Sequence, residues 1–166
     1  GKDIELIGRE DIELKVYPAL PRVPKGFEYL GTDGEFFAYK KTFLKPNVEV
    51  IAKEMALEGN WKTYDLELKL PREALNSSEL SDLFLSIDYG GEIANLYVDH
   101  EHRADNFYGG DLWEVSLKHL SYPDGIKLKI RKLTEGDKIF IEKWPEMIDG
   151  EACRLISVNL LPEFIV

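Results

Sequence analysis

Alternating apolar and polar positions run through much of the chain and predict β-strands. The clearest cases are Leu83–Tyr89, Ala94–Val98 and Ile126–Arg131, in which every second side chain is apolar. Alternate side chains on a strand point to the same side, so each segment has one face suited to burial. Turn residues separate these segments at short intervals. The pattern therefore favours an all-β sandwich or barrel of roughly ten antiparallel strands.

Glycine-rich pairs and triplets between these segments predict where the chain reverses. Gly90–Gly91 predicts a two-residue hairpin turn, because glycine adopts the positive φ angles that such a turn needs. Glu58–Asn60 is a second hairpin signal. An aromatic-rich loop and then a further strand should follow Val98, and Ile139–Ile141 is also expected to be a strand. Pro71–Leu80 is the best helix candidate, since proline suits a first helical turn. We expect at most one short helix.

The length of the chain favours one domain with its own core. The 166 residues are enough for a single sandwich over 1–166. Three prolines between residues 17 and 26 predict an irregular link there, since proline cannot join a central ladder. The repeated DIEL at Asp3–Leu6 and Asp11–Leu14 predicts two short strand pieces.

Charge and composition narrow the classes of partner. The chain carries 21 basic and 31 acidic residues, a net charge of −10. This charge repels phosphate backbones, so we expect no nucleic-acid partner. Because no apolar run approaches the roughly 20 residues of a membrane-spanning helix, we expect no membrane insertion. Cys153 is the single cysteine, so no internal disulfide can form.

Metal binding has two weak candidate patterns. On a strand, His100 and His102 would point to the same side and could bind zinc, but the same residues also suit a solvated turn. Structural calcium is a further possibility, with Asp88, Asp99 and Asp105 as candidate ligands. No EF-hand spacing supports this site, and we predict no cofactor.

The sequence offers no catalytic residues that we can assign. It lacks the G-x-S-x-G nucleophile motif and the glycine spacing of phosphate-binding loops. Glycoside hydrolysis needs two carboxylates at a defined separation. Many of the 31 acidic residues could meet that condition by chance, so it identifies no pair.

Aromatic and polar residues around the predicted loop suggest a carbohydrate site. Aromatic rings stack on the apolar faces of sugars, while amide, carboxylate and guanidinium groups bind the hydroxyls. The candidate residues are Tyr89, Arg103, Asp105, Asn106, Tyr108 and Trp113. The alternative is that Phe107 and Trp113 anchor the core, with Asp105 and Asn106 holding a turn.

The central part of the chain resembles a known family. Leu83–Ile141 is similar to the jelly-roll, galactose-binding-like β-sandwich that follows the catalytic barrel in β-galactosidases of glycoside hydrolase family 35. Four features follow the order found in that family: the Asp88 strand, the Ala94–Val98 strand, the Ala104–Gly110 segment and Trp113. The family's catalytic glutamates lie on its barrel, which needs about 250 residues, so they map onto nothing here.

The resemblance implies a noncatalytic accessory domain of a β-galactosidase-like glycoside hydrolase, acting in carbohydrate metabolism. Such a domain would support the catalytic domain or bind sugar, and its location would be periplasmic or secreted. An autonomous carbohydrate-binding module and a structural protein-interaction domain are the alternatives. The accessory-domain hypothesis predicts an apolar surface patch that contacts the catalytic domain. The carbohydrate-binding-module hypothesis predicts an exposed aromatic platform or a polar groove.

Overall fold

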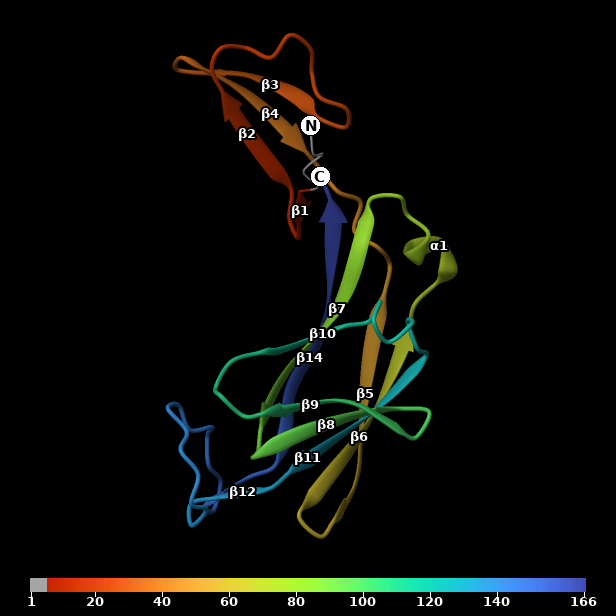
Figure 1. The fold of residues 1–166 in the computed structure, drawn as a ribbon, viewed down its shortest axis with the longest axis vertical. Coiled ribbons are helices and arrows are strands. Elements are labelled where there is room, and N and C mark those ends of the chain that lie inside the picture. Colours follow the sequence, from red (N-terminus) through yellow and green to blue (C-terminus); the bar gives the residue numbers. More distant parts are fainter. Residues whose placement is uncertain (1–5) are drawn as a thin grey trace.

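The prediction of an all-β sandwich is confirmed. A computed structural model describes residues 6–166, which form fourteen strands in antiparallel sheets and one short helix (Figure 1). None of the helices in this part of the chain is long and apolar enough to cross a membrane. The elements are β1 (Ile7–Gly8), β2 (Ile12–Val16), β3 (Glu28–Asp33), β4 (Phe36–Lys41), β5 (Glu49–Glu58), β6 (Trp61–Lys69), α1 (Arg72–Leu75), β7 (Leu80–Gly90), β8 (Ile93–Val98), β9 (Glu101–Phe107), β10 (Trp113–Ser116), β11 (Gly125–Arg131), β12 (Leu133–Thr134), β13 (Glu151–Ala152) and β14 (Arg154–Ile165).

Two sheets form the sandwich. One has the strand order β1-β14-β7-β10, and the other has the order β5-β6-β11-β8-β9. The apolar faces predicted from alternation pack between the sheets, and Leu85, Leu96 and Leu128 are completely buried. The polar faces of both sheets therefore point away from the core, which leaves the outer face of the five-stranded sheet open for function.

The predicted hairpin at Gly90–Gly91 is wrong. β7 and β8 lie in different sheets, so this glycine pair crosses from one layer to the other. Neither glycine has a positive φ. Close packing explains Gly91 instead. A Cβ on Gly91 would collide with the side chain of Ile130 and lie 2.8 Å from the carbonyl oxygen of Arg131.

The hairpin of this region lies nine residues further along the chain, between β8 and β9. Val98 pairs with Glu101, and the two turn residues Asp99 and His100 have φ angles of 49° and 66°. Positive φ at both central positions is the geometry of a type I′ turn, which matches the twist of the strands. The predicted aromatic-rich loop is therefore mostly strand β9.

Other elements differ from expectation mainly in their bounds. The hairpin at Glu58–Asn60 is confirmed, with Gly59 at a φ of 62°. The helix is a single turn, Arg72–Leu75, which is shorter than predicted. The strand expected at Ile139–Ile141 is wrong: this segment is irregular, and Phe140 is 90% exposed because no neighbouring strand covers it.

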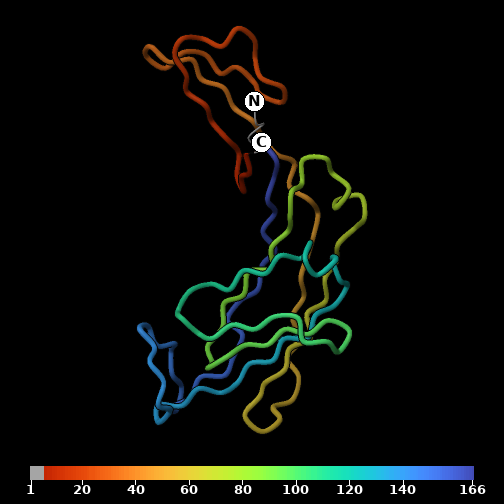
Figure 2. Tube along the Cα trace, in the orientation of Figure 1, coloured from red at the N-terminus to blue at the C-terminus, as the bar shows by residue number. Residues whose placement is uncertain are grey.

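An additional small sheet lies beyond one end of the sandwich. Strands β2, β4 and β3 form it, in that order, and the Cα trace places it apart from the two main layers (Figure 2). At the junction, the ring of Phe43 stacks on that of Phe164 at 4.6 Å, and Arg9 donates two 2.7 Å hydrogen bonds to the carboxylate of Glu114. Of the strand expected at Asp3–Leu6, residues 3–5 lie outside the described part of the chain.

Candidate functional site

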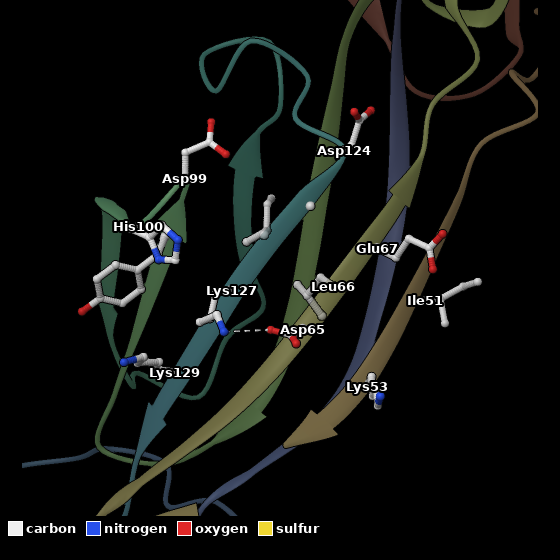
Figure 3. Close-up of a pocket in the computed structure, with 13 residues that line it drawn as sticks. Ile51, Lys53, Asp65, Leu66, Glu67, Asp99, His100, Asp124, Lys127 and Lys129 are labelled. Atoms are coloured by element: carbon white, nitrogen blue, oxygen red, sulfur yellow. Dashed lines mark ion pairs between the residues drawn. The ribbon is translucent and has the colours of Figure 1, made fainter. Parts of the chain in front are cut away.

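The candidate site is a groove on the outer face of the five-stranded sheet. Its lining follows from strand alternation, because successive side chains on a strand point to opposite faces of the sheet. Where Leu66 and Leu128 point into the core, their neighbours Asp65, Lys127 and Lys129 point outward. Figure 3 shows these polar side chains along the neighbouring strands β6 and β11, with Asp99 and His100 to one side of them.

The groove is large enough for a small ligand. Its volume is about 620 Å³, which lies within the range of roughly 300–1,000 Å³ found for ligand pockets. Strands β5, β6, β8 and β11 supply most of the lining, and the β8–β9 turn closes one side with Asp99 and His100. Groups far apart in the sequence therefore meet here.

Both signs of charge face the groove. Lys127 Nζ lies 3.2 Å from a carboxylate oxygen of Asp65, and Figure 3 marks this ion pair between two adjacent strands. Within residues 6–166, Lys53 and Glu67 form no ion pair, although both line the groove. These exposed donors and acceptors are available to a polar ligand, since hydrogen bonds to charged groups are stronger than neutral ones.

Tyr97 supplies the aromatic surface of the groove. It points outward from β8, where Lys129 Nζ lies 5.3 Å from the centre of its ring. The ring of His102 meets Tyr97 edge-on at 5.4 Å. A cation–π contact at this half-buried, open position contributes on the order of 1 kcal/mol, so a ligand can displace the ammonium group at low cost.

The structure distributes the six predicted sugar-binding residues over different surfaces. Tyr89 is 2% exposed and belongs to the core. Its hydroxyl donates to the carbonyl oxygen of Asn106 at 2.7 Å and accepts from the Asn106 side-chain amide at 2.9 Å. Burial raises the pKa of Tyr89 to about 12. Tyr89 and Asn106 therefore use their hydrogen-bonding groups on each other and offer few of them to a ligand.

Asn106 faces the core from β9, and strand alternation directs its chain neighbours Asp105 and Phe107 to the opposite, outer face. Asp105 pairs with Asn95 and faces outward, and its carboxylate lies 3.7 Å from His102 Nε2. Phe107 is 73% exposed, so it is not the core anchor considered above. Arg103 is exposed, and its guanidinium donates to a backbone carbonyl oxygen at 3.5 Å.

Tyr108 and Trp113 lie at the edge of the sandwich, away from the groove. The ring of Tyr108 packs edge-on against Tyr89 at 5.6 Å, and its pKa is raised by burial and by the nearby carboxylates of Asp88 and Asp111. Trp113 begins β10 in the four-stranded sheet and packs partly buried against the core. Of the predicted set, Asp105 alone shares the outer face with the groove.

The metal candidates are also separated. Asp88 lies in the four-stranded sheet, while Asp99 occupies the β8–β9 turn and Asp105 lies in β9. His100 is a turn residue, so it does not share a strand with His102 as the predicted zinc pair assumed. No group of three or more metal-binding side chains comes together anywhere in residues 6–166.

The sequence analysis missed the residues that form the groove. Lys127 and Lys129 carried a signal, because they occupy the polar face of a strand whose other face is apolar, whereas Tyr97 shares its face of the strand with Ile93 and Asn95. Which strands pair could not be read from that signal. Strand β11 lies between β6 and β8, and this pairing brings the three side chains together.

Comparison of the chain with protein-family models, with curated proteins and with solved structures finds no match. The resemblance to glycoside hydrolase family 35 therefore stays a prediction.

Proposed function

We propose that this chain is a noncatalytic accessory domain of a β-galactosidase-like glycoside hydrolase and that it binds carbohydrate through the groove on its five-stranded sheet. The observation that carries the proposal is the combination of Tyr97 with exposed charged groups in one open groove. A sugar ring offers apolar C–H faces to an aromatic side chain and hydroxyls to polar ones. Both kinds of partner stand side by side here.

A binding role suits the groove better than a catalytic one. The carboxylates of Asp65 and Glu67 point outward from the same strand, but Asp65 is paired with Lys127. A catalytic acid in a glycosidase needs a raised pKa, which usually comes from burial in an apolar pocket. Because the groove is open and its carboxylates are not enclosed, it favours recognition of a sugar over its hydrolysis.

The small N-terminal sheet supports the accessory part of the proposal. Its strands and the connection between β2 and β3 expose several large apolar side chains beyond the end of the sandwich, and these would suit contact with a catalytic domain. They are Tyr17, Val23, Tyr29, Leu30 and Phe36.

Isothermal titration calorimetry of the wild type and Tyr97→Ala tests the sugar site. We expect saturable binding to a member of a panel of galactose, lactose, and plant and host polysaccharides. Tyr97→Ala should weaken this binding by about tenfold, which is about 1.4 kcal/mol, because the stacking surface is lost. The melting temperature should change little, since Tyr97 lies on the outer face.

Phe107→Ala is the matched control. Phe107 is an exposed aromatic residue on the same outer face but lies outside the groove, so its removal should leave the affinity unchanged. If no sugar in the panel binds the folded protein, or if Tyr97→Ala binds as the wild type does, the proposed site is wrong.

A further inference from the structure

A second depression adjoins the groove on the same face of the sheet. Its volume is about 330 Å³. Glu58, Trp61 and Thr63 line it from the β5–β6 hairpin, and Asn95 lines it from β8. It shares two lining residues with the groove, and these are Tyr97 and Lys129.

The two depressions follow one another along the strands. On β6, the lining residues pass from Trp61 and Thr63 in the second depression to Asp65 and Glu67 in the groove. Strand β8 shows the same order, from Asn95 through Tyr97 to the turn at its end. At about 3.3 Å per residue, the stretch from Trp61 to Glu67 spans roughly 20 Å. This span is longer than one sugar ring.

We infer that the two depressions form one elongated site, which binds a linear carbohydrate chain of several sugar units lying along the strands. This inference rests on the proposed function. Tyr97 and Lys129 stand at the middle of the site, where an internal sugar of the chain would stack and hydrogen-bond. The chemistry at the two ends differs, and this difference would give the chain a direction.

The character of each end follows from its lining. The groove carries charged groups from strands β5, β6 and β11 and from the β8–β9 turn, among them Lys53 and Glu67. The second depression is lined by the indole of Trp61, the hydroxyl of Thr63 and the amide of Asn95, and Glu58 supplies its one carboxylate. One end is therefore suited to many hydroxyl contacts, while the other combines an aromatic surface with neutral hydrogen-bonding groups.

A chain-length series tests the elongated site. The probes are galactose and β-1,4-linked galactose oligomers of two, four and six units, each titrated calorimetrically into the full chain. We expect the affinity to rise with length, with the six-unit oligomer binding about tenfold or more tightly than the two-unit one. A single-sugar site would give the same affinity along the series.

Variants at each end show whether both depressions are used. Lys53→Ala changes only the groove, and Asn95→Ala changes only the second depression. We expect each to weaken binding of the six-unit oligomer by about threefold or more while the melting temperature is retained, and Phe107→Ala to have no effect. An effect of Lys53→Ala without one of Asn95→Ala would confine the ligand to the groove and overturn the inference.

The outcomes separate this inference from the function on which it rests. Equal affinities for galactose and the six-unit oligomer, with Tyr97→Ala still weakening both, would contradict the elongated site and leave the proposed function standing. If neither this series nor the polysaccharide panel binds, both are wrong.

Discussion

At the scale of single residues, the role of Tyr89 follows from strand alternation and not from its residue type. Its aromatic ring and its neighbourhood of polar residues are typical of a sugar site, but β7 directs it into the core. There its hydroxyl both donates to and accepts from Asn106. The inward face of Leu83, Leu85 and Ile87 was predictable from the same alternation, and Tyr89 continues it.

Tyr89→Phe tests this structural role through its pH dependence. At neutral pH we expect a loss of about 1–2 kcal/mol in the free energy of unfolding, because the polar groups of Asn106 lose their partner. In the folded protein the pKa of Tyr89 is about 12, against about 10 in an unfolded chain. The stability due to this difference is complete below pH 10 and is lost as the pH rises through 12.

Urea denaturation between pH 9 and pH 12 checks this expectation. The free energy of unfolding of the wild type should fall more steeply with pH than that of Tyr89→Phe. Tyr108 and Tyr122 also have raised pKa values, but they are present in both proteins and cancel in the comparison. Parallel curves would show that the hydroxyl of Tyr89 is not held in the core.

At the scale of elements, the strands were easier to predict than the connections between them. Alternation identifies β7, β8 and β11 because one face of each is apolar over Leu83–Tyr89, Ala94–Val98 and Ile126–Ile130. The Gly90–Gly91 connection was misread, since glycine serves close packing as well as positive φ. Asp99 and His100 form the hairpin without a glycine, which removed the usual signal of a type I′ turn.

A pair of glycine variants tests the account of this crossover. Gly91→Ala should lower the free energy of unfolding by about 1–3 kcal/mol, because its methyl group would meet Ile130 and the backbone of Arg131. Gly109→Ala is the matched control. Nothing lies within 4 Å of a Cβ at that position, so the change should stay within about 0.5 kcal/mol. Thermal and urea denaturation measure both, and equal effects would contradict the packing argument.

At the scale of the whole molecule, sheet topology creates the candidate site. The polar outer faces of β6 and β11 were visible in the sequence, but the adjacency of these strands to each other and to β8 was not. The pairing of β11 with both β6 and β8 depends on contacts between residues that are far apart along the chain. Asp105 could be proposed as a sugar-binding residue from its carboxylate alone. Its position on the same face as Tyr97 depends on the pairing of β8 with β9, which the sequence does not give.

Mapping a bound sugar by nuclear magnetic resonance tests the central claim most directly. The ¹⁵N-labelled chain is titrated with the six-unit galactose oligomer while backbone amide shifts are recorded. The account predicts shift changes confined to β5, β6, β8, β11 and the Asp99–His100 turn, centred on Tyr97. Saturable changes centred instead on Tyr108 and Trp113, or no change at any amide of the folded protein, would contradict it.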